Sequence, residues 1–418
     1  MLSMTTKKKN YKIALIDQKG NIGGGIKFAK QLILNFNEFY PAIKIDFYVN
    51  PNSIKKLNLN KINLKNISIK ELKSLKLREH GFFSLKNSEK IIKQIQEKFL
   101  KKSKFLNYYY SGNLNLELEK KIKGYDFAFF LWPYLIDLPE IKVKKFIILH
   151  DFMFKYYFGG FGSFNINEIE KQNYFLDKWV KNSNIIVTSN YMKKELNKFY
   201  PKVSDKKIHL IRIGPLTYFE NTKEKIDIFK KFNINSKYIL CPTVDKPHKN
   251  ILNLIKAFNL VKKKHKKLKL VFCGSGTNLM NGKLFDNKIQ ISETDKEVFG
   301  LGFVSDEELK ILIKRAEMTI NTSIYDAGNG SGLDAWQIGS PVLMSNIPPF
   351  IEQLKYLKVQ AVTFDPNNHF DLYKKINLLL KYSKNKKQQM ITVSQKNIRE
   401  FGWKKVVSEY FNLMNKLS

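Results

Sequence analysis

The densest group of residues that could carry out chemistry lies in the run Tyr325-Asp-Ala-Gly-Asn-Gly-Ser-Gly-Leu-Asp-Ala-Trp-Gln-Ile-Gly-Ser-Pro-Val342. Its glycines would let backbone N–H groups approach a ligand closely. A helix that we expect to begin near Leu333 would add the positive end of its dipole. Together these features predict an anion site suited to a diphosphate. The predicted binding residues are Asn329, Gly330, Ser331, Gly332, Leu333 and Asp334.

Two carboxylates, Asp326 and Asp334, stand eight positions apart in this run. Carboxylates accept hydrogen bonds from hydroxyl groups and do not hold phosphate. The pair therefore favours a nucleotide sugar as the ligand. A flexible turn with a helix-capping aspartate would give the same residues, and this alternative stays open from the residues alone.

A second candidate is Lys249, in the run Pro247-His-Lys-Asn-Ile-Leu-Asn-Leu-Ile-Lys-Ala-Phe258. The run is expected to be a turn between a strand and a helix, which places Lys249 near the start of the helix. A cation there opposes the helix dipole unless an anion lies between them. The position therefore predicts a phosphate partner, and a solvated lysine is the alternative.

Three further candidates stand where a predicted strand ends. Gly274-Ser-Gly276 follows one strand, the triplet Gly23 to Gly25 follows the first strand, and His150-Asp151 closes another. A short glycine motif is weak evidence for a phosphate site, because tight turns need the same residues. A histidine at a strand end is often structural. The glycine spacing also differs from the G-x-G-x-x-G that a dehydrogenase would need.

The elements that must position these residues form two βα series. In the first, strands are predicted at 11–16, 44–49, 126–131, 145–150 and 184–188, with a helix at 26–36. In the second, strands are predicted at 238–241, 269–273, 318–321 and 341–344, with helices at 251–261 and from the capping box Ser305 to Glu308. The two halves join near 212–235, and ligands usually bind at the carboxyl ends of such sheets. Residues 51–125 are lysine-rich and read as irregular decoration.

The glycine-rich run resembles the carboxylate–seven–carboxylate signature of GT-B glycosyltransferases, specifically retaining glycosyltransferase family four. Gly332-Leu-Asp-Ala335 and Gly339-Ser-Pro-Val342 match its second part, although aspartates replace the usual glutamates. Ser345 to Glu352, the 247–258 run and Phe401-Gly-Trp403 also resemble the family, and the tryptophan is expected in the core. The fold implied is α/β with the GT-B architecture, two Rossmann-like doubly wound domains facing a cleft. The implied domains are 1–215 on the acceptor side, 216–395 for the nucleotide sugar, and 396–418 as a helix crossing back.

The resemblance also implies residue roles. Asp326 and His150 would contact the donor sugar, Asp334 the ribose hydroxyls, and Lys249 the diphosphate. Val244 replaces an arginine common in the family, so Lys246 or His248 would supply the second charge. Gly24, Gly25, Gly274 and Gly276 would line the donor site. No D-x-D motif or metal-ligand spacing occurs in the sequence, so we expect neither a metal nor a cofactor.

Composition excludes several classes of protein. The chain has 418 residues, of which 43% are hydrophobic, so it is not disordered. Cys241 and Cys273 are predicted to be unpaired, which favours the cytosol, and no run is apolar enough to span a membrane. The net charge is +36, yet only four of the 73 basic residues are arginines, which argues against nucleic acid as a partner.

The prediction is a retaining, metal-independent transferase acting on a nucleoside-diphosphate hexose, with GDP favoured as the nucleotide. The acceptor would be a glycan or a lipid-linked glycan of cell-surface polysaccharide or lipopolysaccharide. The basic amphipathic stretch Ser88 to Lys104 suggests peripheral contact with an anionic membrane, and an ordinary surface helix is the alternative. Two other functions stay open: a nucleotide-sugar epimerase on the same scaffold, and a non-catalytic basic protein that binds nucleic acid or membrane.

Overall fold

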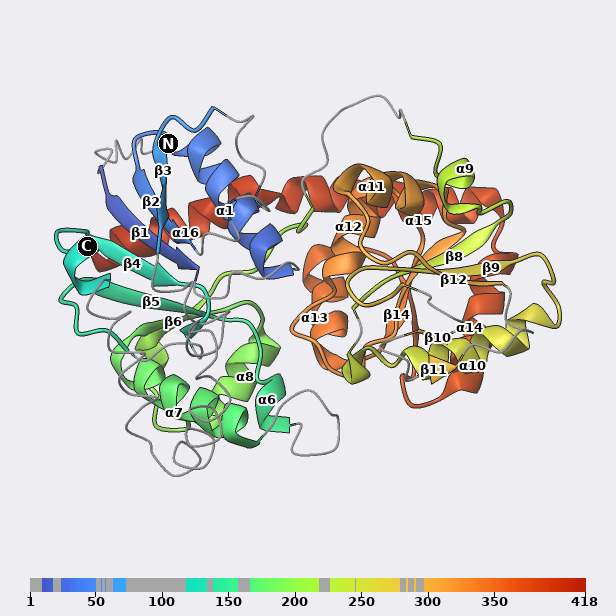
Figure 1. Ribbon diagram of the computed structural model, residues 1–418, viewed down its shortest axis with the longest axis horizontal. Coiled ribbons are helices and arrows are strands. Elements are labelled where there is room, and N and C mark those ends of the chain that lie inside the picture. Colours follow the sequence, from blue (N-terminus) through green and yellow to red (C-terminus); the bar gives the residue numbers. More distant parts are fainter. Residues whose placement is uncertain are drawn as a thin grey trace, which may run out of the picture.

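The computed structural model has two α/β lobes that lie side by side, each built on its own parallel sheet (Figure 1). The amino-terminal lobe holds the strands up to residue 210, and the carboxyl-terminal lobe holds those from residue 238 onward. The structure describes residues 10–17, 24–49, 54, 57, 63–72, 118–133, 138–156, 166–217, 226–244, 246–278, 283–284, 289–290 and 297–418.

Within these residues the sheet of the amino-terminal lobe has seven parallel strands in the order β3-β2-β1-β4-β5-β6-β7. Their bounds are β1 Lys12–Asp17, β2 Lys44–Val49, β3 Ile67–Glu71, β4 Phe127–Phe130, β5 Lys144–Leu149, β6 Asn184–Val187 and β7 Ile208–Leu210. In the register, Ile13 pairs with Ile45 on one side and with Phe127 on the other. Strand β4 is wholly apolar, and β5 is apolar and buried after its first two lysines, as expected of a parallel sheet covered on both faces.

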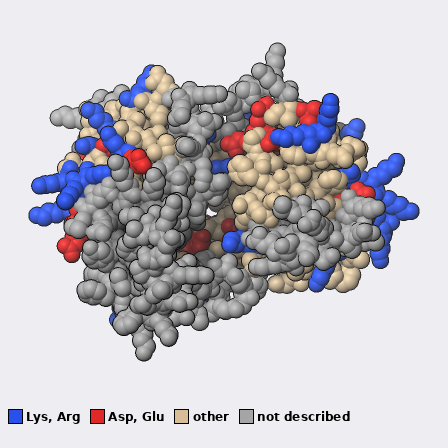
Figure 2. Space-filling model, viewed as in Figure 1, with Lys and Arg blue, Asp and Glu red and all other residues tan. Residues whose placement is uncertain are grey.

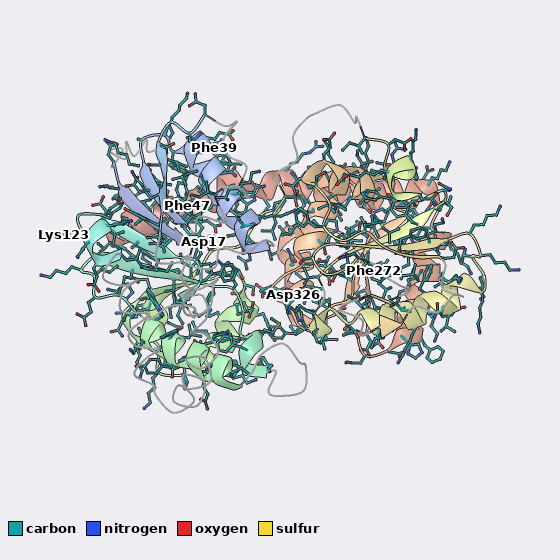
Figure 3. All side chains as sticks on the ribbon, viewed as in Figure 1. Asp17, Phe39, Phe47, Lys123, Phe272 and Asp326 are labelled. Carbon is teal, nitrogen blue, oxygen red and sulfur yellow. The ribbon has the colours of Figure 1, made fainter. Side chains whose placement is uncertain are left out.

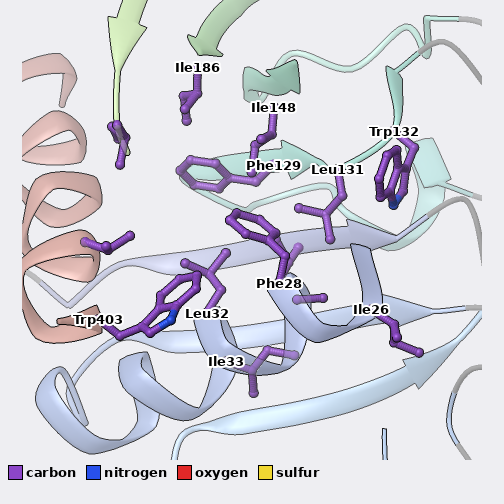
Figure 4. Packing of buried hydrophobic residues seen from close by; sticks show 14 of the residues in the cluster. Ile26, Phe28, Leu32, Ile33, Phe129, Leu131, Trp132, Ile148, Ile186 and Trp403 are labelled. Carbon is purple, nitrogen blue, oxygen red and sulfur yellow. The ribbon is translucent and has the colours of Figure 1, made fainter. Parts of the chain in front are cut away.

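Helices cover this sheet and supply its core. They are α1 Gly24–Phe39, α6 Met153–Tyr156, α7 Ile166–Asn182, α8 Asn190–Phe199 and the short 3₁₀ helix η3 Asp205–Lys207. The buried side of α1 includes Phe28 and Leu32, which point toward Phe129 and Ile148 of the sheet (Figure 4). Burying one such side chain contributes roughly 1.5–3 kcal/mol. This packing fixes the start of α1 at the carboxyl edge of the sheet.

The carboxyl-terminal lobe has a second parallel sheet, whose six strands in the described part of the chain run in the order β12-β9-β8-β13-β14-β15. Their bounds are β8 Tyr238–Pro242, β9 Lys269–Cys273, β12 Val298–Gly300, β13 Met318–Asn321, β14 Val342–Ser345 and β15 Val362–Phe364. A small antiparallel pair, β10 Lys283–Leu284 and β11 Ile289–Gln290, stands apart from this sheet. The central strands β13 and β14 are buried along their whole length, and β8 is buried except at Pro242.

The helices of this lobe precede, alternate with and follow its strands in sequence. They are α9 Ile228–Phe232, the 3₁₀ helix η4 Pro247–Lys249, α10 Ile251–Lys262, α11 Asp306–Arg315, α12 Gly330–Ile338, α13 Pro348–Leu357, α14 His369–Lys381 and α15 Lys384–Phe401. Ser305 and Glu308 form the predicted capping box at the start of α11, where each side chain binds the backbone of the other residue.

The last helix, α16 Trp403–Leu417, returns to the amino-terminal lobe and packs against α1 (Figure 1). Gly402 separates it from α15. The indole N–H of Trp403 donates a hydrogen bond to the carbonyl of Pro215 at 2.6 Å, and the side chain is buried. Trp403 therefore belongs to the core at the junction of the lobes, as predicted.

The predicted fold class is confirmed, since both lobes are α/β with parallel sheets. Two local predictions are wrong. Residues 67–71 form β3 within a stretch expected to be irregular, and α12 begins at Gly330 and not near Leu333, because Asn329 caps it. Neither Cys241 nor Cys273 forms a disulfide. The stretch Ser88 to Lys104 and the glycines Gly20 and Gly23 lie outside the described residues.

Among the described helices none is long and apolar enough to cross a membrane. Lysine and arginine side chains project from the outer edges of both lobes (Figure 2). Among the residues coloured in this view, the positive charge lies at both ends of the molecule and not in one stripe.

Candidate functional site

A cavity of about 350 Å³ lies between the two lobes. Its walls come from the start of α1, the carboxyl ends of β8 and β9, the start of α12 and the segment that joins the lobes. Asp326 stands on the edge of the carboxyl-terminal lobe that faces Asp17, at the end of β1 in the other lobe (Figure 3). The predicted residues that line the cavity are Gly24, Lys249, Gly274, Asp326, Gly330, Ser331 and Asp334.

Lys249 and Asp326 form an ion pair in this cavity, with Nζ and Oδ2 2.5 Å apart. Both side chains are mostly buried, at 18% and 23% exposure. The hydroxyl of Ser323 donates to the same Asp326 oxygen at 3.2 Å, and the hydroxyl of Thr322 donates to the Lys249 carbonyl at 2.6 Å. Two of the three residues predicted to be catalytic are therefore held together by the residues that follow β13.

Of the two residues near Lys249 that could add positive charge, Lys246 and His248, only the lysine is charged at pH 7. Burial lowers the pKa of His248 to about 4, helped by the neighbouring Lys249 and Lys246, so its imidazole is neutral at pH 7. Lys246 is exposed at the start of η4 and is not part of the cavity wall. Of the two residues expected to supply a second positive charge, Lys246 or His248, the histidine is disfavoured, because desolvation disfavours the imidazolium.

The turn after β9 requires glycine at residue 274. Gly274 has φ +129°, and a Cβ there would lie 1.8 Å from the Thr243 carbonyl oxygen. Its N–H donates to the Gly302 carbonyl at 2.7 Å, which ties the turn to the residues after β12. Gly276 also has a positive φ, +77°, but does not line the cavity. The first glycine thus shapes the cavity wall, and the second shapes the turn.

The start of α12 is built by its own polar residues. The Asn329 side chain is fully buried and accepts hydrogen bonds from Gly332 N–H at 2.8 Å and Asn321 Nδ2 at 2.9 Å. A Cβ on Gly332 would lie 2.3 Å from the Asn329 amide nitrogen. Leu333 is buried in the core. The side chains of Asn329 and Leu333 are therefore directed into the protein, and they shape the loop that presents Gly330 and Ser331.

Asp334 lines the cavity, but both of its carboxylate oxygens are already bound. Thr217, in the segment between the lobes, donates its backbone N–H to Oδ1 at 3.0 Å and its hydroxyl to Oδ2 at 2.5 Å. Burial raises the pKa of Asp334, while Lys27 and the two Thr217 hydrogen bonds act in the opposite direction. This carboxylate holds the interlobe segment in the structure.

His150 lies at the end of β5 in the amino-terminal lobe, outside the cavity wall. Its ring stacks on Trp132 at 4.4 Å and meets the edge of Phe28 at 5.4 Å. A Cβ on Gly25 would lie 2.1 Å from the same tryptophan. Gly25 is thus required by the close approach of Trp132 to the start of α1.

Sequence reasoning missed residues that connect the lobes. The Phe152 N–H donates to the Tyr325 hydroxyl at 3.0 Å, which ties the Asp326 loop to the strand end that carries His150. Glu352 of α13 accepts hydrogen bonds from the backbone N–H groups of Asn190 at 2.7 Å and Tyr191 at 2.8 Å. The family resemblance marked Glu352 but gave it no role. A local sequence pattern could not have assigned a role to Glu352, because the hydrogen-bond partners of Glu352 lie in the other lobe.

The chain has the two-lobed GT-B fold of known glycosyltransferase structures. It aligns with HepE of Anabaena, solved with UDP and glucose, at a TM-score of 0.65 and 13% identity, covering 98% of this chain and 99% of that one. It aligns with TarM of S. aureus at a TM-score of 0.67 and 15% identity, covering 98% and 100%. It is also similar to WaaG, at a TM-score of 0.59 and 12% identity, covering 93% and 94%.

Residues 222–397 match the family model described as glycosyl transferases group 1. The match covers the carboxyl-terminal lobe, so the similarity to the group 1 glycosyl transferases lies in this part of the chain. A stretch of 189 residues is 30% identical to an uncharacterized glycosyltransferase, MJ1607, of Methanocaldococcus jannaschii, covering 44% of this chain. The chain spans about half, 47%, of the length of that relative.

Proposed function

We propose that the protein is a retaining glycosyltransferase that moves a hexose from a nucleoside-diphosphate sugar to an acceptor hydroxyl. The observation that carries the proposal is the Lys249–Asp326 pair, placed beside the Gly330 end of α12 in one cavity. A lysine and a helix start together suit a diphosphate, and a carboxylate suits sugar hydroxyls. Similarity to HepE and TarM, both solved with UDP, supports this class of donor.

In the proposed reaction the bond between the anomeric carbon and the phosphate oxygen breaks. The acceptor oxygen bonds to the same face of that carbon, and its proton passes to the departing phosphate oxygen. Lys249 and the amides at the start of α12 would stabilise the charge that develops on the diphosphate, which is commonly the largest catalytic contribution. Asp326 would orient the sugar, and His150 would contact it after the lobes close further.

The finer assignments are also proposals. From the sequence motifs we favour GDP as the donor nucleotide, although HepE and TarM were solved with UDP. The acceptor is a glycan or lipid-linked glycan of cell-surface polysaccharide or lipopolysaccharide. The reaction would use no metal or cofactor and take place in the cytoplasm, at the inner face of an anionic membrane. The net charge of +36 supports the membrane contact. Similarity to WaaG, a glycosyltransferase involved in lipopolysaccharide biosynthesis, supports the acceptor class.

The first experiment is thermal stabilisation by GDP, UDP, ADP, dTDP and CMP at millimolar concentration. A ligand at 100 times its dissociation constant stabilises the folded state by roughly 2.7 kcal/mol. We expect one nucleoside diphosphate to stabilise most and Lys249→Ala to lose the effect. Lys256→Ala, an exposed lysine on α10, is the matched control and should respond like the wild type.

Two other results would contradict the proposal. Conversion of the donor to its epimer without an acceptor would favour an epimerase. No response to any nucleotide, with salt-sensitive binding to polyanions, would favour a basic binding protein.

A further inference from the structure

Lys27 is a cation of the amino-terminal lobe that faces the donor cavity. It lies in the first turn of α1, and its side chain forms part of the cavity wall. Its ammonium lies 2.9 Å from Asp306 Oδ1 at the start of α11 and 3.0 Å from Thr217 Oγ1. A cation in the first turn opposes the helix dipole, so this position needs an anion nearby.

The cavity otherwise has little positive charge for a diphosphate. Lys249 is already paired with Asp326, and Val244 stands where the resembled family often has an arginine. His248 is neutral at pH 7, since burial lowers its pKa to about 4. Of the described residues that line the cavity, only Lys27 and Lys249 are cationic. They come from opposite lobes.

We infer that Lys27 binds the donor diphosphate from the amino-terminal lobe, opposite Lys249. This inference rests on the proposed function. A phosphate oxygen would replace Asp306, which is 38% exposed and can be hydrated when released. Lysine suits this exchange because its point charge sits on a flexible stem. One ligand would then neutralise a cation of each lobe, so donor binding would hold the lobes together.

The test measures binding of GDP, UDP and ADP, of inorganic pyrophosphate, and of the matching nucleosides by calorimetry. Loss of a charge-assisted hydrogen bond typically weakens binding about ten- to hundred-fold. We expect Lys27→Ala to weaken binding of pyrophosphate and of the preferred nucleoside diphosphate by this factor. Nucleoside binding should not change, and Lys27→Arg should restore most of the affinity. Lys30→Ala, one turn further along α1, is the matched control.

Asp306→Asn separates this role from a merely structural ion pair. It removes the partner and leaves Lys27 in place, so diphosphate affinity should stay equal or rise. Weakening equal to that of Lys27→Ala would overturn the inference. The inference would also be overturned if Lys27→Ala bound the nucleoside diphosphate as tightly as the wild type while Lys249→Ala lost binding. The proposed function would survive that result. If the wild type binds no nucleoside diphosphate, the proposed function fails and the inference fails with it.

Discussion

Asp334 and Thr217 are joined by two hydrogen bonds, although 117 residues separate them in sequence. The carboxylate is on α12 of the carboxyl-terminal lobe, and the threonine lies in the segment that enters this lobe. Since both carboxylate oxygens are bound, the structure gives Asp334 a positioning role. Each carboxylate oxygen can accept a second hydrogen bond, so the ribose contact implied by the family resemblance stays a prediction. Aspartate is one methylene shorter than the glutamate usual in the family, which suits the short reach to Thr217.

This relationship predicts strong coupling between the two residues. Asp334→Ala should lower the free energy of unfolding by about 1–3 kcal/mol, because a buried N–H is left unpaired. Thr217→Val should cost less, and the double variant should lose less than the sum, with a coupling energy above about 0.5 kcal/mol. Denaturant unfolding of the four proteins measures the cycle. Additive losses would show that the pair does not act as a unit.

The buried histidine predicts a specific pH dependence. The folded pKa of His248 is about 4, below its ordinary 6.5, so the unfolded chain takes up the proton first as the pH falls. Stability is therefore lost between pH 6.5 and 4, by up to about 2 kcal/mol from pH 7 to pH 5. His248→Gln should show a correspondingly smaller loss in unfolding experiments at both pH values. An equal loss in both proteins would rule out His248 as the source.

The cap that Glu352 places on α8 predicts that this helix depends on the opposite lobe. Glu352 binds the first two N–H groups of α8, Ser189 binds the N–H of Met192 at 3.0 Å, and Arg212 approaches Glu352 at 3.4 Å. Glu352→Ala should lower the unfolding free energy by about 1–3 kcal/mol.

Amide exchange at Asn190 and Tyr191 should accelerate in the same variant. Glu400→Ala, an exposed glutamate on α15, is the control and should leave both amides unchanged. Unchanged exchange in Glu352→Ala would mean that water replaces the carboxylate without loss of protection.

Two glycines of the cavity wall should differ sharply in tolerance to alanine. Gly274→Ala combines a strained φ with overlap against Thr243, so a loss of at least about 2 kcal/mol is expected. Gly328→Ala has only the Gln353 side chain at 4.0 Å and should stay within about 0.5 kcal/mol. Thermal unfolding of both variants checks this. Similar losses of unfolding free energy in the two variants would show that steric overlap and the positive φ do not explain why residue 274 is glycine.

Local pattern was enough to place the central strands of both sheets and the loops that carry chemistry, but it missed β3, β7, β12 and β15. Alternation, glycine turns and the capping box at Ser305 are properties of neighbouring residues, so strands such as 44–49, 269–273 and 318–321 were predicted with their observed bounds. The pairing of Lys249 with Asp326 was not predicted. It follows from the strand order, which sets β8 beside β13 and so brings the loops after these two strands together. The family resemblance added the roles.

Only the tertiary structure decided which charges meet across the lobes. Lys27 and Thr217 carry no distinctive local signal, and Glu352 was marked by the resemblance without a role. Each acquires a partner far away in sequence when the chain crosses between lobes. Burial likewise decides that His248 is neutral while Lys249 stands beside a carboxylate. Sequence thus determined the sheets and the residues available at their edges. Packing of one lobe against the other determined the partners, because hydrogen bonds and desolvation depend on distances that no sequence period contains.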